Sequence, residues 1–214
     1  MRILKVFCLA TVVAGVGLCQ TSAKPEPKFK PSVDIVTVDY RYAQPTGLRS
    51  VRDVDFANLK VVVLDDHGKP FRTIPFNHGR AEWRDTWGNE ADIGGIYFFE
   101  DRKHTGERAL IEVGWLSVGG SSSQTDYVMV FETHAGNLYA TQQISYDAHA
   151  QWWTLSKFYP ESATLIVLGR TEDDSPHCCP KSLDEVMFNW NRDRFDITDA
   201  QRLFVEQNGC GGAN

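Results

Sequence analysis

Two adjacent cysteines followed by a proline, Cys178, Cys179 and Pro180, are the residues whose types and spacing most readily suggest chemistry. Zinc sites prefer cysteines separated by about two to four residues, and neighbouring side chains on an extended strand point in opposite directions. The Cys-x-x-Cys spacing of redox enzymes is missing. A nucleophilic cysteine needs a positioned histidine, and His177 is too close in sequence to be presumed that partner. The pattern favours a structural disulfide.

The connectivity of that disulfide stays open, because Cys210 is a third candidate. Adjacent Cα atoms lie about 3.8 Å apart, whereas disulfides join Cα atoms about 4.4 to 6.8 Å apart. A Cys178–Cys179 bond would therefore be strained and easily reduced. A bond from Cys210 to either member of the pair is geometrically easier and would tie the C-terminal tail to the sheet. Free or metal-bound thiols are the third alternative, and an odd number of cysteines leaves one sulfur over.

Histidine and serine provide no recognisable catalytic or metal motif. The six histidines lack the spacing of a metal site, so we predict neither a bound metal nor a cofactor. His149 could act as a base if a neighbouring strand supplied a carboxylate. The loop Gly119-Gly120-Ser121 lacks the strand–turn–helix context of a serine nucleophile, and we predict that it connects two strands.

Trp152 and Trp153 are the best candidates for ligand contact, because consecutive strand residues face opposite sides and one indole would point outward. An outward tryptophan can stack on a sugar ring or anchor a protein partner. We therefore expect Trp152, Trp153 and nearby His149 to contact an unidentified protein or saccharide.

The N-terminus predicts export. Arg2 and Lys5 precede an uncharged apolar run of 13 residues, 6–18, shorter than the roughly 20 residues that span a membrane. This is the pattern of a signal peptide cleaved after Ala23. We expect a signal peptide at 1–23, an extended leader at 24–32 and a single β-rich domain at 33–214, in a secreted or periplasmic protein. Lipid attachment through Cys19 is the alternative.

Charge argues against two classes of partner. The chain carries a net charge of −6, which becomes about −8 when the two basic residues of 1–23 leave. Such a surface lacks the basic footprint of a nucleic-acid-binding protein, and it does not favour anionic membranes. We predict no nucleic-acid partner and no membrane span.

Short segments rich in β-branched and aromatic residues follow one another from Val33 onward. Turn signals such as His134-Ala135-Gly136-Asn137 separate them. We predict an all-β fold, an antiparallel sandwich or a strongly curled sheet, with at most one short C-terminal helix at Asp199–Gln207. The expected strands are 33–40, 59–65, 72–76, 95–99, 109–116, 127–133, 137–144, 152–158, 163–169 and 185–190.

Three stretches in order resemble a family of uncharacterised bacterial secreted proteins and lipoproteins: Val51–Asn58 (VRDVDFAN), Arg108–Thr133 with its Gly-Gly-Ser loop, and the Cys-Cys-Pro segment that runs to Phe195. The last stretch is also similar to LppP/LprE-type lipoproteins. The resemblance implies export and a β-rich fold, and it assigns no reaction. Where relatives carry a calcium-loop-like run, this chain has Glu100–Glu107 with three basic or imidazole side chains in the middle, so we expect a solvated hairpin loop.

These observations predict an exported, non-catalytic domain that binds a ligand or an envelope component. Two alternatives stay open. One is an extracellular hydrolase whose site is assembled from separate strands, and the other is a thiol-redox or metal protein centred on the cysteine pair.

Overall fold

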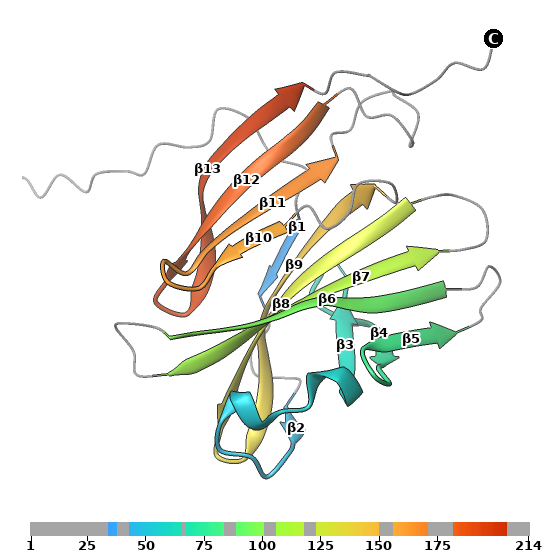
Figure 1. The fold of residues 1–214 in the computed structure, drawn as a ribbon, viewed down its shortest axis with the longest axis vertical. Helices are drawn as coiled ribbons and strands as arrows, with labels where there is room; N and C mark the ends of the chain where they lie inside the picture. Colours follow the sequence, from blue (N-terminus) through green and yellow to red (C-terminus); the bar gives the residue numbers. More distant parts are fainter. Residues whose placement is uncertain are drawn as a thin grey trace, which may run out of the picture.

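The computed structural model describes residues 34–37, 43–65, 67–83, 89–100, 106–117, 123–149, 156–170 and 182–204, and almost all of them lie in antiparallel strands (Figure 1). Seven strands form what we call the central sheet: β1 (Asp34–Thr37), β2 (Gln44–Pro45), β5 (Arg80–Trp83), β6 (Asn89–Glu100), β7 (Glu107–Ser117), β8 (Ser123–His134) and β9 (Asn137–His149). Their order is β1-β9-β8-β7-β6-β5, and β2 also pairs with β9.

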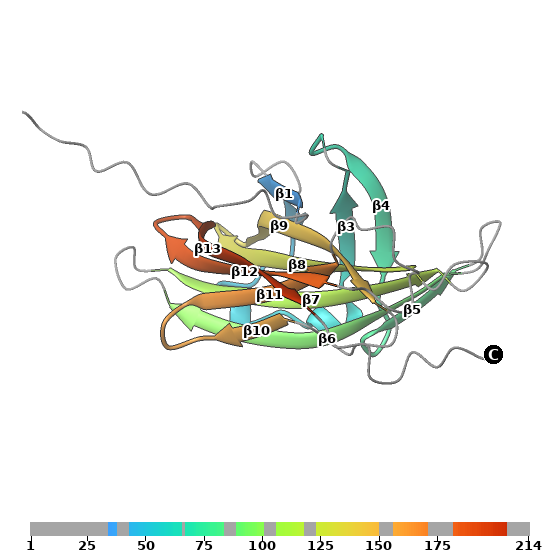
Figure 2. The ribbon, with the colours of Figure 1, turned by 90° about the horizontal axis from the view of Figure 1, so that it is seen from above.

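Two smaller sheets cover the central sheet. One is the hairpin of β3 (Lys60–Leu64) and β4 (Pro70–Pro75). The other, which we call the C-terminal sheet, is a meander of β10 (Ser156–Tyr159), β11 (Thr164–Arg170), β12 (Ser182–Asn191) and β13 (Arg194–Phe204). Figures 1 and 2 show the two small sheets on opposite sides of the central sheet.

The predicted all-β fold is confirmed, since the described residues contain no helix of seven or more residues. Two 3-10 turns, η1 (Val51–Asp53) and η2 (Phe56–Asn58), occupy the VRDVDFAN segment. Within the described part of the chain, no helix is long and apolar enough to cross a membrane.

Local turn chemistry behaves as predicted at the β8–β9 hairpin. His134 pairs with Asn137, and the two residues between them have positive φ, 49° at Ala135 and 78° at Gly136. Successive positive φ angles match the twist of the flanking strands. The loop at Glu100–Glu107 is also a hairpin connection, because Glu100 pairs with Glu107, although residues 101–105 lie outside the described residues.

The described part of Asp199–Gln207 is not helical. Asp199 pairs with Met187 and Phe204 pairs with Ser182, so the segment up to Phe204 continues β13. Ladder pairing with β12 supplies hydrogen bonds and apolar contacts that a short isolated helix lacks. Tertiary pairing therefore overrides the weak helical pattern.

Two hydrophobic cores lie on the two faces of the central sheet, and the alternation of β8 separates them. Tyr127, Met129 and Phe131 belong to the core beneath the β3–β4 hairpin, whereas Val128 and Val130 belong to the core beneath the C-terminal sheet. This division of faces follows from the two-residue period of a strand. Because both faces are buried, the molecule has three layers.

Aromatic rings dominate the core beneath the C-terminal sheet. Phe99 of β6 lies 5.1 Å from Trp190, 5.3 Å from Phe158 and 5.8 Å from Phe195 between ring centroids. The first two contacts are edge-to-face, an arrangement that adds about 0.5–1.5 kcal/mol per pair beyond burial. Phe99 thus connects the central sheet to three strands of the C-terminal sheet.

Two adjacent buried glutamines of β9 attach the outer layers. The Gln142 amide donates to the Phe195 carbonyl at 2.9 Å and accepts from the Phe195 N–H at 2.8 Å. The Gln143 amide makes the same pair of bonds with Leu64, both at 3.0 Å. Since neighbouring strand residues face opposite sides, Gln142 holds β13 and Gln143 holds β3. We call these four hydrogen bonds the glutamine clamps.

Removing either glutamine side chain should destabilise the fold. Gln142→Ala or Gln143→Ala leaves one buried backbone N–H and one buried C=O without their partner, a loss of about 2–4 kcal/mol in the free energy of unfolding. Urea denaturation measures it. Gln201→Ala is the control, because this exposed amide bonds Glu185 on β12 and its loss should cost less than about 0.5 kcal/mol.

Hydrogen exchange should separate the two clamps. Gln142→Ala should accelerate exchange at the Phe195 amide, and Gln143→Ala should accelerate it at the Leu64 amide. If Gln142→Ala and Gln143→Ala had the same free energy of unfolding as Gln201→Ala, the glutamine clamps would contribute no more to stability than an exposed hydrogen bond.

Candidate functional site

The residues that the sequence singled out fall mostly outside the described part of the chain. Trp152, Trp153, Cys178, Cys179 and Cys210 all lie there. His149 is the last residue of β9 and pairs with Ser123 in backbone register, but its side chain is not among those described. The predictions for these six residues therefore stay predictions.

Three of the histidines have described side chains, and all three are exposed. His67, His78 and His134 all lie on the surface at or beside turns. Among the described residues, no three His, Cys, Asp or Glu side chains gather so as to hold a metal ion.

An exposed aromatic residue on β4 is the first element of a candidate site. Phe71 is 58% exposed, and its ring stacks on that of Trp115 with 5.7 Å between centroids and 28° between planes. Exposed aromatic rings on rigid strands provide contact area at low cost in conformational entropy. We call these two stacked rings the aromatic platform.

A β-bulge places Phe71 there. Arg72 pairs with Val63 and Pro70 pairs with Leu64, so Phe71 is the extra residue of β4 at this irregularity. Bulges bend a strand and redirect side chains. The redirection lets both Phe71 and Arg72 reach Trp115, whose ring centroid lies 5.6 Å from the Arg72 guanidinium carbon.

Trp115 is fixed from below by the central sheet. It extends from β7 between Ala91 on β6 and Thr125 on β8, and its ring is 6.2 Å from that of Tyr127. Its indole Nε1 donates to Asn89 Oδ1 at 3.0 Å. The platform therefore rests on an indole held by both packing and a directed hydrogen bond.

Asn89 has a second hydrogen-bonding group. Its side chain is buried, with 6% of the residue exposed. In the part of the chain that the structure describes, the buried Nδ2 has no hydrogen-bond acceptor. Beside the platform there is thus a buried amide donor, in addition to the oxygen that holds Trp115.

The platform can bind a ring rather than perform a reaction. A flat aromatic surface attracts the apolar face of another ring, and the Arg72 guanidinium over Trp115 is a cation–π contact. A neutral amide is neither a nucleophile nor an acid or base near neutral pH. Together these groups fit the pattern of an apolar surface with a few placed polar groups.

A second set of polar residues lies between the central sheet and the C-terminal sheet. Glu112 and Asp126 are diagonal neighbours on β7 and β8, and both are buried. Asp184 on β12 is fully buried and bonds Arg202 at 3.0 Å. Carboxylates in a hydrolase must reach substrate, whereas these three carboxylates are covered by protein.

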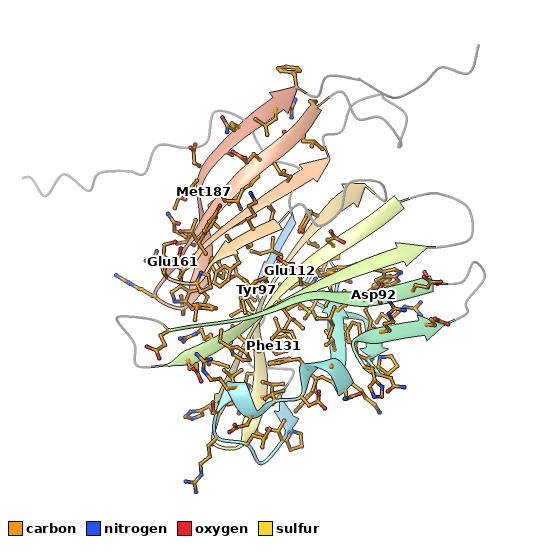
Figure 3. All side chains as sticks on the ribbon, in the orientation of Figure 1. Asp92, Tyr97, Glu112, Phe131, Glu161 and Met187 are labelled. Carbon is orange, nitrogen blue, oxygen red and sulfur yellow. The ribbon has the colours of Figure 1, made fainter. Side chains whose placement is uncertain are left out.

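Tyr97 lies close to this acidic set, and Figure 3 shows Tyr97 and Glu112 on the side of the central sheet that faces the C-terminal sheet. Gly95 pairs with Glu112, and the Tyr97 ring covers Gly95 so closely that a Cβ there would lie 2.6 Å from a ring carbon. Burial raises the pKa of the Tyr97 hydroxyl, and the negative charge of Glu112 raises it further.

Sequence reasoning did not single out Phe71, Trp115 or Asn89. Alternation along β4 could not have placed Phe71, because the bulge at this residue interrupts the two-residue period and brings both Phe71 and Arg72 to the Trp115 ring. The contact of Phe71 with Trp115, 44 residues away in sequence, is not readable from the pattern.

Titration should detect the Tyr97 environment. Because the folded state keeps the Tyr97 proton beyond the ordinary pKa of about 10, stability should fall as pH rises above that value. Ultraviolet absorbance should show a late-ionising tyrosine that disappears in Tyr97→Phe and remains in the control Tyr159→Phe. In Glu112→Gln its pKa should fall only part of the way, since burial is the larger cause. A late-ionising tyrosine that persists in Tyr97→Phe contradicts the assignment.

No protein-family model, no curated protein and no solved structure matches this chain.

Proposed function

We propose that this chain is an exported, non-catalytic binding domain whose ligand stacks on the aromatic platform. The observation that carries the proposal is the exposed Phe71 ring, held flat against Trp115. A large aromatic side chain loses contact with water when a ligand covers it, and such residues contribute disproportionately to binding.

Preorganisation supports the same proposal. Trp115 is already held by the hydrogen bond to Asn89 and by the contact with Tyr127. The protein side chains would therefore lose little conformational entropy when a ligand binds, which favours affinity. The β3–β4 hairpin that carries Phe71 is itself attached to the central sheet through Gln143.

Export is part of the proposal. It rests on the charged start and apolar run of residues 1–23, and on the resemblance to bacterial secreted proteins and lipoproteins. An oxidising compartment would favour a disulfide among Cys178, Cys179 and Cys210. The ligand would then be a component of the envelope or of the surroundings of the cell.

Binding is better supported than hydrolysis. The platform offers a surface that a ligand can cover, whereas Glu112, Asp126 and Asp184 are buried between two sheets. The alternative centred on Cys178 and Cys179 concerns residues outside the described part of the chain.

Thermal shift measurements test the proposal. The probes are cellotetraose, chitotetraose, maltotetraose and a blocked tetrapeptide of apolar residues, each at millimolar concentration. A ligand that binds only the folded state raises the melting temperature in proportion to RT ln(1 + [L]/Kd). We expect at least one probe to stabilise the wild-type protein and to have no effect on Phe71→Ala.

A matched control separates the platform from other exposed rings. Tyr159→Ala removes an exposed aromatic residue of the C-terminal sheet and should leave the thermal shift unchanged. The proposal fails if none of the probes stabilises the wild type, or if the shift survives in Phe71→Ala.

A further inference from the structure

One stretch of β6 is an open edge of the central sheet. Strand β5 pairs with only the first four residues of β6, and Figure 1 shows it beside that end alone. The turn before β5 reaches one residue further, since the Ile93 N–H donates to the Gly79 carbonyl at 2.8 Å. Beyond the bulge at Gly94, residues 95–100 pair with β7, and no other described backbone group bonds them. We call residues 95–100 the open edge.

Backbone groups on the open edge can recognise another backbone. Every second residue of an antiparallel strand directs its N–H and C=O away from the neighbour with which it is paired. At an edge these groups form a row of donors and acceptors that matches an extended chain. Addition of a strand to such an edge is a general mode of peptide recognition. The occupant that fits this surface is therefore a β-strand.

The edge strands β1, β5, β10 and β13 have features that discourage such addition. The first three have four residues each. The longer β13 has a bulge and four charged residues: Arg194, Asp196, Asp199 and Arg202. Short edges, charges and bulges all oppose pairing with another chain. The open edge has six residues, GIYFFE, with no proline and with Glu100 as its one charge.

Apolar side chains line both faces of the open edge. Ile96 is 39% exposed, and alternation puts it on the same face as Phe98, which packs against the core beneath the β3–β4 hairpin. Tyr97 lies on the opposite face, where its ring contacts Phe158 of β10 with 5.6 Å between centroids. Pairs of aromatic and β-branched residues on neighbouring strands are favourable. An added strand should therefore carry β-branched residues on both of its faces.

Charge specifies the residue at one end of that strand. Glu100 is exposed, and it makes no ion pair among the described residues. The residue opposite it on β7, Glu107, already bonds Arg52 and Ser50. The Glu100 carboxylate is thus available to a basic residue of the partner. In an antiparallel partner that residue would come first, because the two strands run in opposite directions.

A second copy of this chain fits the open edge less well. Residues 95–100 contain no lysine or arginine, so pairing of two copies would bring together two Glu100 side chains and no base. The whole chain is also negatively charged, at −6, and a net charge of one sign opposes self-association. The surface favours a partner of different sequence.

We propose that the open edge binds an extended segment of another protein as an additional antiparallel strand. The segment carries β-branched residues on both faces and a lysine or arginine opposite Glu100. This surface is separate from the aromatic platform, because Phe71 lies on the β3–β4 hairpin.

A synthetic peptide tests the proposal on the whole folded chain. Acetyl-Lys-Val-Val-Thr-Val-Thr-amide has the required pattern, and two-dimensional ¹⁵N NMR measures its dissociation constant. We expect the backbone amides of residues 95–100 to shift, and those of residues 89–92, which β5 covers, to stay in place.

N-methylation of the peptide separates strand addition from apolar contact and needs no protein variant. One version is methylated at residues 1, 3 and 5, and the other at residues 2, 4 and 6. In an added strand only one of these sets faces β6, so one version should bind at least about tenfold more weakly, because up to about three hydrogen bonds are blocked. The other version should bind nearly as well as the parent peptide.

Three variants check the surface and the charge. Ile96→Lys puts a cation on the open edge, which should abolish binding. Glu100→Lys should reverse the preference for the parent peptide over one that begins with glutamate, a preference of about two- to fivefold, the size of an exposed ion pair. Phe71→Ala is the control and should leave binding of the peptide unchanged.

The outcomes separate this proposal from the proposed function. Absence of binding by the parent peptide, or equal binding of the two methylated versions, overturns it and leaves the platform untouched. Binding that Phe71→Ala abolishes would assign the peptide to the platform and overturn it as well. Sedimentation tests the other occupant: a wild-type dimer that Ile96→Lys dissociates would assign the open edge to a second copy and overturn the proposal.

Discussion

Two adjacent glutamines on one strand connect all three layers of this molecule. Gln142 faces the C-terminal sheet and Gln143 faces the β3–β4 hairpin, and each uses both ends of its amide on one backbone residue. A buried amide is tolerated in an apolar core only when its hydrogen bonds are made. The same bonds fix the position of each outer layer, because a shifted strand would break them. The apolar contacts supply most of the favourable free energy of folding. The glutamine clamps fix where β13 and β3 lie relative to the central sheet.

The binding surface depends on the same arrangement. Gln143 holds Leu64, and the bulge that redirects Phe71 lies opposite Val63 and Leu64. The clamp and the platform are therefore parts of one hairpin, attached at one point and exposed at another. Trp115, on the central sheet, completes the platform from below. A platform assembled from two layers is only as rigid as the attachment between them.

The sequence was a good guide to local structure and a poor guide to long-range contact. The turn at Ala135-Gly136 was predicted correctly because positive φ is a local property. The division of faces along β8 is local too, since it follows from the two-residue period of a strand. Strand β13 was missed because its pairing with β12 overrides a weak helical pattern. The role of Gln142 was missed because its partner is 53 residues away. For the site, neither the exposure of Phe71 nor its stacking on Trp115 follows from alternation, because a bulge interrupts the period of β4 at this residue.

The central claim is that the chain binds a ligand that stacks on the exposed Phe71 ring above Trp115. The most direct measurement is two-dimensional ¹⁵N NMR of the wild-type protein during addition of the saccharide or peptide probe that gives the largest thermal shift. The account predicts that the Phe71 backbone amide and the Trp115 indole N–H shift together, with a common dissociation constant, while the Trp190 indole N–H in the opposite core does not move. Shifts confined to other residues, with these two signals unchanged, would contradict it.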